Sequence, residues 1–235
     1  MDEGFVSSTL GTKEYWDDAY HEELQNFHEI GDEGEIWFGP ESVEKMVDSI
    51  LDHYPIPTDS TESPSILEIG CGNGMLLFAA HEAGYNPGKM HGIDYSENAI
   101  SLAKSVASKK ETRDATLIKF TKHDFLTEDI PRDDTTSGGW DLILDKGTFD
   151  AISLGKKDES GHAPHQLYPQ RLSALMKPGG RFLITSCNFT EDELKSVFLK
   201  PEAGLVYHSR IQHPTFTFGG QSGSIVVTLA FEKPQ

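Results

Sequence analysis

The sequence contains little cysteine and no long apolar run, and each absence excludes a class of protein. The 235 residues include only two cysteines, Cys71 and Cys187, which is too few for a disulfide framework in a chain of this length, so we expect reduced thiols. No apolar run approaches the roughly 18 residues of a membrane span, and the acidic start of the chain is unlike a secretory signal. We therefore expect a cytoplasmic protein without membrane contact.

Basic side chains are also scarce. The chain has 20 lysines and arginines against 38 acidic residues, which gives a formal net charge of -18. Such a charge repels phosphate backbones, which argues against a nucleic-acid partner, and it attracts lysine-rich protein surfaces, although solubility alone would explain it equally well. The ten histidines show no ligand spacing with cysteine or acidic partners, so we expect no metal.

What the chain does contain is an alternation of strand-like and helix-like segments. Hydrophobic residues make up 37% and charged residues 25%, as in ordinary globular proteins. The periodicity predicts strands at 65–69, 89–93, 116–121, 140–144 and 180–186, with helices near 75–83, 97–108, 147–154, 167–176 and 191–198. This order is typical of an α/β fold with a mostly parallel sheet and helices on both faces.

The two ends of the chain depart from that alternation. Two amphipathic helices are expected before residue 54, one capped by Thr12 and one starting near Pro40. Residues 55–64 form a polar, proline-bearing linker, and 65–235 form the core of one domain that spans 1–235. At the other end, 204–211 and 224–232 have no room between them for a crossover helix, so they should pair as an antiparallel hairpin.

The most informative segment is Ile66–Gly74, an apolar run that ends in Glu68 and three alternate glycines, Gly70, Gly72 and Gly74. Glycine lets the backbone turn sharply and pass against a ligand where a Cβ would clash. A dinucleotide loop would place its third glycine at Met75, so the spacing favours S-adenosylmethionine, with Glu68 reaching the cofactor's ammonium group through water or backbone amides. A nucleotide loop and a plain tight turn remain as alternatives.

Further candidates follow the next two strands, because a doubly wound sheet places its ligands at the carboxyl ends of its strands. Asp94 can accept both ribose hydroxyls, with Tyr95 beside it, or can belong to the start of a helix. Asp124 can accept from the adenine amino group while Phe125 covers a ring face, or can form a surface turn. These residues complete the predicted cofactor site.

The fourth strand ends in Asp145–Asp150, the expected floor of the site. Methyltransferases that act on adenine N6 or glutamine amides usually carry an Asn/Asp-Pro-Pro-aromatic turn here, and this chain has none. Asp145 is predicted to orient an arriving amine. The alternative is that Asp145 caps the next helix while Lys146 and Asp150 are solvated.

Six segments resemble one known family. They are Leu10–Trp16, Gly34–Gly39, the glycine loop at 67–74, Asp145–Asp150, Ser186–Thr190 and Phe218–Gly220. Together they are similar to the seven-stranded protein lysine methyltransferases, most closely to the elongation factor 1-alpha lysine methyltransferases of fungi and animals. Where that family is expected to carry a tryptophan, this chain has Phe189, which keeps an aromatic wall but has no N–H for any hydrogen bond made there.

The resemblance implies a Rossmann-like fold with a seven-stranded methyltransferase sheet. It also implies an enzyme that uses S-adenosylmethionine to methylate a lysine of elongation factor 1-alpha. It implies that Trp37, Gly70, Asp94, Asp124 and Asp145 line the cofactor or its mouth. It also implies that the substrate amine arrives over Asp145 and the loop 186–190, with Asn188 and Phe189 as substrate-binding residues. From composition alone Trp37 reads as a hydrophobic plug, and Thr190 with Glu193 as a capping box. We expect a monomer. The alternatives are an enzyme of the same fold acting on another protein or a small molecule, and a non-catalytic cofactor-binding module.

Overall fold

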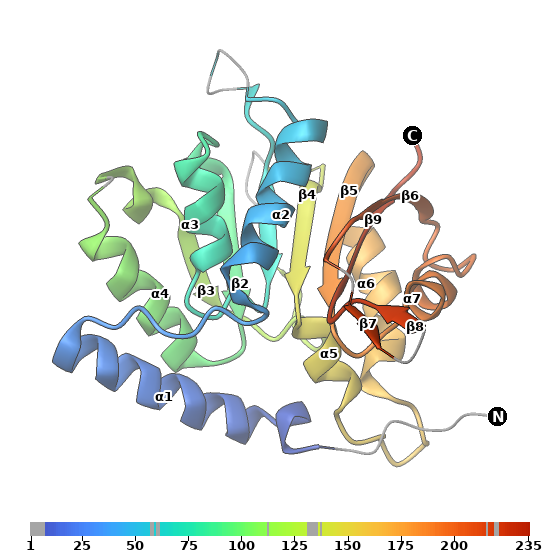
Figure 1. Ribbon diagram of the computed structural model, residues 1–235, viewed down its shortest axis with the longest axis horizontal. Helices are drawn as coiled ribbons and strands as arrows, with labels where there is room; N and C mark the ends of the chain where they lie inside the picture. Colours follow the sequence, from blue (N-terminus) through green and yellow to red (C-terminus); the bar gives the residue numbers. More distant parts are fainter. Residues whose placement is uncertain are drawn as a thin grey trace.

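The structure is a computed structural model that describes residues 8–56, 59, 62–111, 113–130, 136, 138–214, 216–218 and 221–235. Its centre is a seven-stranded sheet in the order β3-β2-β1-β4-β5-β9-β6 (Figure 1). The strands are β1 Ile66–Ile69, β2 Met90–Asp94, β3 Lys119–Lys122, β4 Trp140–Lys146, β5 Met176–Ser186, β6 Val206–Ile211 and β9 Val227–Glu232. The topological switch point, where the strand order reverses, therefore lies between β1 and β4.

The strand directions confirm the predicted mixed sheet. The neighbours among β1 to β5 pair in parallel, and β9 runs antiparallel to both β5 and β6. The predicted C-terminal hairpin is therefore present, with β9 inserted between β5 and β6. β5 begins at Met176, earlier than predicted, because Met176 pairs with Trp140 before a register shift.

Seven α-helices in the described residues follow the predicted order. They are α1 Lys13–Ile30, α2 Gly39–His53, α3 Met75–Glu82, α4 Glu97–Lys109, α5 Thr148–Ser153, α6 Tyr168–Leu175 and α7 Glu191–Phe198. The Thr12 side chain accepts from the Tyr15 amide at the start of α1, and Thr190 forms a capping box with Glu193 at the start of α7. Both predicted helix starts are confirmed.

Alternation along the strands divides the core between two faces. Ile66, Leu142 and Leu144 pack with buried residues of α2, α3 and α4. Their chain neighbours Leu67 and Ile143 point the other way and pack with α5, α6 and α7. Successive side chains of a strand point to opposite faces, so helices cover the sheet on both sides, as predicted.

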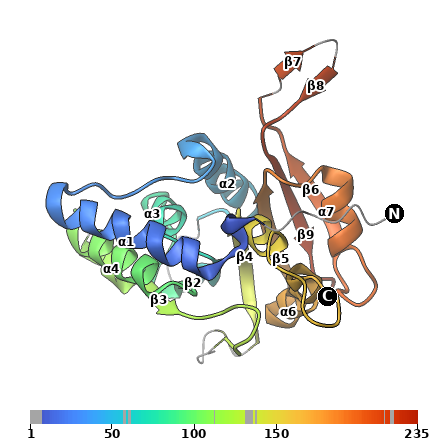
Figure 2. The same cartoon turned by 90° about the horizontal axis from the view of Figure 1, so that it is seen from below.

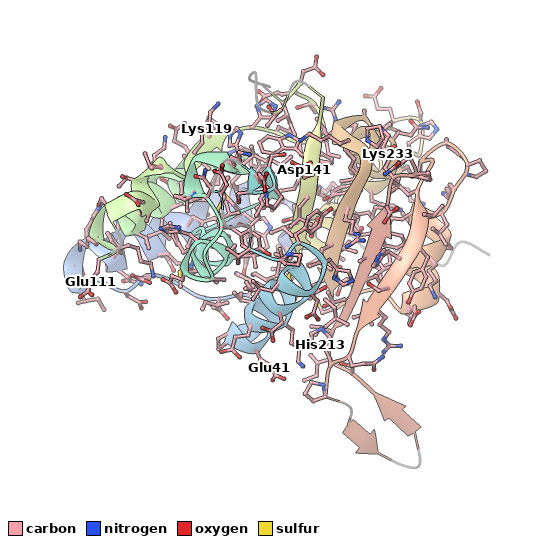
Figure 3. All side chains as sticks on the ribbon, turned by 90° about the horizontal axis from the view of Figure 1, so that it is seen from above. Glu41, Glu111, Lys119, Asp141, His213 and Lys233 are labelled. Carbon is pink, nitrogen blue, oxygen red and sulfur yellow. The ribbon has the colours of Figure 1, made fainter. Side chains whose placement is uncertain are left out.

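The sheet has one edge where its parallel strands begin and an opposite edge where they end, and the two have different surroundings. Figure 3 looks at the edge where the parallel strands begin, where Asp141 accepts from the Ser65 hydroxyl at 2.7 Å and pairs with Lys177 at 2.8 Å. At the opposite edge, where these strands end, α1 passes beneath the sheet in Figure 1. The carboxyl ends of β1 to β5 therefore face the N-terminal segment.

One element was not predicted. Strands β7 Phe216–Phe218 and β8 Gln221–Gly223 pair antiparallel and form a second, two-stranded sheet. Figure 2 shows this ribbon projecting from the body beyond β6 and β9. Among the described helices, none is long and apolar enough to cross a membrane.

Candidate active site

A cavity of about 320 Å³ opens at the carboxyl ends of the parallel strands. We call the part beside the ends of β1, β2 and β3 the β1–β3 half, and the part beside the ends of β4 and β5 the β4–β5 half. The N-terminal segment closes a third side through Leu10, Gly11, Trp16, Tyr20, Glu35, Trp37 and Phe38. A cavity of this size lies within the range of ordinary ligand pockets.

Two of the three motif glycines line the cavity, at positions where the backbone leaves no room for a side chain. Gly70 has φ +66°, and a Cβ on it would lie 1.9 Å from the Thr148 hydroxyl oxygen. Gly72 has φ +51°, and its Cβ would lie 2.4 Å from the Tyr20 hydroxyl oxygen. Gly74 does not line the cavity and instead precedes α3, where a Cβ would meet the Phe120 ring at 2.8 Å. Its role is packing.

Asp94 ties the end of β2 to the glycine loop. One carboxylate oxygen accepts from the Gly72 amide at 3.1 Å, and the other accepts from the Ser96 amide at 2.9 Å. Burial raises the pKa of Asp94 to about 6, against the effect of these two hydrogen bonds. Asp94 borders the start of α4, and it also lines the cavity beside Tyr95. That Asp94 accepts the ribose hydroxyls stays a prediction.

The loop after β3 holds itself together. The Asp124 carboxylate accepts from the Leu126 amide at 2.9 Å and from the Thr127 hydroxyl at 2.7 Å, which makes it a turn residue that also lines the cavity. Phe125 lines the cavity too, and Arg171 of α6 donates to its carbonyl at 2.6 Å. That Asp124 and Phe125 hold the adenine ring stays a prediction.

Glu68 is buried and is not part of the lining of the cavity. Its side chain is 2% exposed, and burial raises its pKa, while the nearby Lys146 ammonium acts in the opposite direction. In the part of the chain that the structure describes, one of its carboxylate oxygens has no hydrogen-bond partner. Glu68 is therefore not placed for direct contact with a ligand in the cavity. Its contact with the cofactor's ammonium group through water or backbone amides stays a prediction.

The loop before α2 covers the cavity and is fastened to its floor. The Lys146 ammonium donates to the Trp37 carbonyl at 3.0 Å, and the Trp37 ring packs against Trp16 with centroids 4.8 Å apart. Phe38 has φ +66°, uncommon for a residue with a side chain, and its ring lies over Gly147. Trp37 and Phe38 both line the cavity, as the resemblance implies for Trp37. A hydrophobic plug and a cover over the cofactor both remain interpretations of this pair.

Asp145 occupies a different place from the one predicted. Its carboxylate is fully buried and accepts from the Thr148 amide at 2.9 Å, the Phe149 amide at 3.0 Å and the Tyr168 hydroxyl at 2.5 Å. Burial raises its pKa to about 7 despite these hydrogen bonds. It caps α5, as the alternative held, and does not line the cavity, because strand alternation places it on the face of Ile143, under α5 and α6. The geometry therefore favours the alternative role of Asp145 as a helix cap, and its role in orienting an amine stays a prediction.

Asp150 lines the cavity instead. The residue is 5% exposed, so the alternative that it is solvated is wrong. One carboxylate oxygen accepts from the Ser186 hydroxyl at 2.5 Å, and the other accepts from the Cys187 amide at 2.7 Å. Asp150 thereby fixes the loop after β5 and brings Asn188 to the cavity.

Phe189 leaves the cavity for the core. It is 7% exposed and packs against Phe149 with ring centroids 5.0 Å apart. Of the two predicted substrate residues, Asn188 lines the cavity and Phe189 does not. In this structure the Phe189 ring therefore packs in the core under α5 and α7, and its contact with the substrate stays a prediction.

Comparison with known proteins identifies the family. A family described as "Methyltransferase domain" matches residues 60–217. Protein-lysine N-methyltransferase efm4 of Schizosaccharomyces pombe is 40% identical over 97% of this chain and 96% of its own length. EEF1A lysine methyltransferase 2 of Homo sapiens is 40% identical over 99% of this chain and 90% of its own length.

The chain belongs to the EEF1A lysine methyltransferase 2 family. Its membership confirms the resemblance carried by the sequence segments and confirms S-adenosylmethionine as the cofactor. Solved structures agree on the fold: N-methyltransferase NodS of Bradyrhizobium japonicum, in complex with S-adenosylhomocysteine, has a TM-score of 0.59 at 16% identity, over 94% of this chain and 99% of its own.

The residues of this EEF1A lysine methyltransferase 2 family member fit the cofactor. Gly70 and Gly72 line the cavity without side chains, and a Cβ on either would meet Thr148 or Tyr20, which line the same cavity. The Asp94 carboxylate lies at the end of the adjacent strand. Residues that sequence reasoning did not assign to the site also line it, among them Tyr20, Asn73, Thr148 and Cys187. Asn73, Thr148 and Cys187 carried a signal, since they lie inside the segments that resemble the family, whereas Tyr20 lies outside them.

Proposed function

We propose that this enzyme transfers a methyl group from S-adenosylmethionine to a lysine of translation elongation factor 1-alpha. The proposal is carried by near full-length similarity, at about 40% identity, to relatives named for that reaction. A cavity that continues past the glycine loop into the β4–β5 half supports it, because a methyl acceptor must meet the donor beside that loop.

The amine has to be neutral when it reacts. A free lysine has a pKa near ~10.4, so only a small fraction is neutral at physiological pH. When bound, the cofactor supplies an electrophilic methyl group on a positively charged sulfur. Burial of the lysine side chain in the cavity and that positive charge both disfavour the ammonium form, so proton loss to water suffices without a dedicated base. Positioning of the amine then carries most of the catalysis.

The N-terminal segment is proposed to act as a lid within a single domain. Trp16 and Trp37 contact each other across the cavity wall, and Lys146 fastens the Trp37 backbone to the floor. Together they would exclude water from the site and leave an entrance for a side chain.

The proposed partner is a protein with a basic surface, and we place the encounter in the cytoplasm with the enzyme as a monomer. A net charge of -18 steers such a surface toward the enzyme and disfavours nucleic acid. Association should therefore slow as ionic strength rises.

Transfer of labelled methyl from S-adenosylmethionine to purified elongation factor 1-alpha, followed by mass spectrometry, tests the proposal. We expect label on one lysine with the wild-type enzyme and at least about tenfold less with Asp94→Asn at limiting cofactor, since charge-assisted hydrogen bonds contribute about 1.5–3 kcal/mol. Absence of label, with S-adenosylhomocysteine still raising the melting temperature, would contradict it and favour a small-molecule substrate or a non-catalytic module.

A further inference from the structure

We propose that the carboxylate of Asp150 binds the amine of the acceptor lysine in the β4–β5 half of the cavity. This inference rests on the proposed function and names the residue that holds its substrate.

The position of Asp150 separates it from the other carboxylates of the cavity. Asp94 and Asp124 follow β2 and β3, and Glu35 belongs to the covering loop. Among the described lining residues that the ends of β4 and β5 contribute, Asp150 carries the carboxylate. In a doubly wound sheet the reacting groups meet at the switch point, here between β1 and β4, so an acceptor faces the residues that follow β4.

The carboxylate keeps capacity for another donor. One oxygen accepts a hydrogen bond from the Ser186 hydroxyl, and the other accepts one from the Cys187 amide. The Cys187 side chain and the Asn188 amide also lie close enough to lower the pKa of the carboxyl group. A carboxylate offers about four lone-pair sites, so each oxygen can accept once more. The existing bonds hold the carboxylate in place where Asp150 lines the cavity.

The electrostatics favour a cation at this place. Burial raises the pKa of Asp150, and the hydrogen bonds from Ser186 and Cys187 offset only part of that effect. Asp150 belongs to none of the ion pairs found among the described residues, and the neighbouring Asp145 adds a like charge. A buried carboxylate with neutral partners is stabilised by an arriving ammonium group.

The walls around Asp150 suit the rest of a lysine side chain. Phe38, Ile152, Leu154 and Pro164 supply apolar lining in the same cavity. A lysine has a flexible apolar stem of four carbons that ends in a compact ammonium, and such stems pack along apolar surface while the charged end finds its partner. The lining therefore matches lysine along its length.

Asp150 would also direct the amine after it loses its proton to water. A neutral amine keeps N–H donors, and one of them can donate to Asp150, which turns the nitrogen lone pair away from the carboxylate and toward the β1–β3 half. The N–C bond forms as the S–C bond breaks. Asp150 accepts no proton in this scheme.

A double-mutant cycle in binding tests the contact. Wild-type enzyme and Asp150→Asn, each with S-adenosylhomocysteine, are titrated with elongation factor 1-alpha carrying either the target lysine or Lys→Met at that position. We expect the wild type to bind the lysine form about 10- to 100-fold more tightly, and Asp150→Asn to bind both forms equally. Its affinity for S-adenosylhomocysteine should stay within about twofold of wild type, which shows an intact fold.

Ser186→Ala is the matched control, because it releases one bond to Asp150 and keeps the carboxylate. It should retain most of the lysine preference. A lysine preference that survives in Asp150→Asn, or an equal loss in Ser186→Ala, would overturn the inference. If the wild type labels no lysine of elongation factor 1-alpha, the proposed function itself fails, which the labelling experiment shows separately.

Discussion

The two halves of the cavity are built in different ways. In the β1–β3 half the backbone shapes the site. Gly70 and Gly72 have positive φ angles, and the Gly72 amide donates a hydrogen bond to Asp94. In the β4–β5 half side chains shape it, through the carboxylates of Asp145 and Asp150 at the two ends of one short segment.

The difference shows how reliably each half can be read from sequence. A glycine required by backbone geometry leaves a trace at one position, whatever surrounds it. A carboxylate has its role set by the face toward which its strand or helix turns it, and by what covers that face. Asp145 turns into the core and stabilises the floor, whereas Asp150 turns to the cavity.

The largest effect is expected where the two halves touch. Gly70→Ala would put a Cβ on a residue with φ +66° and 1.9 Å from the Thr148 hydroxyl oxygen, an atom that also donates to the Ile69 carbonyl at 2.9 Å. We expect a loss of about 2–5 kcal/mol in the free energy of unfolding, measured in urea. Gly31→Ala is the control, since Gly31 has φ +78° and nothing within 4 Å of its Cβ. Similar losses for both variants would show that backbone strain alone acts at Gly70.

The next effect separates cofactor binding from acceptor binding. Asp94→Asn should raise the Kd for S-adenosylhomocysteine about 10- to 100-fold by calorimetry, because the neutral amide is a weaker acceptor than the carboxylate. At saturating cofactor its lysine preference should match wild type, whereas Asp150→Asn should show the reverse pattern. If Asp94→Asn loses the lysine preference as well, the two halves do not act independently.

The smallest effect tests the buried floor. Tyr168→Phe removes the hydroxyl that donates to Asp145 at 2.5 Å. Burial raises the pKa of Asp145 to about 7 from 3.8, so the native state holds its proton longer, and this residue makes stability fall as pH rises from about 4 to about 7. The lost bond then costs about 1.5–3 kcal/mol at pH 9, where Asp145 is charged, and about 0.5–1.5 kcal/mol at pH 5. Equal losses in urea unfolding at both pH values would contradict the assigned charge state.

Most of the fold was predictable because its signals are local. Thr12 and Thr190 mark helix starts because a threonine side chain can cap the first amides of a helix. The alternation of strands and helices predicts the parallel sheet. The β7–β8 ribbon was missed because its strands are short and pair only with each other. The packing of Phe189 against Phe149 could not be predicted, because an aromatic residue suits a cavity wall and a core equally well until its packing partners are known.

The sequence by itself determined where the chain must turn, which residues end the strands and which cofactor class the glycine loop accommodates, since these depend on backbone sterics and short-range periodicity. Only the tertiary structure decided which of two nearby carboxylates, Asp145 and Asp150, reaches the cavity. The physical reason is that orientation depends on contacts with Tyr168 and Ser186, residues that folding brings from distant parts of the chain.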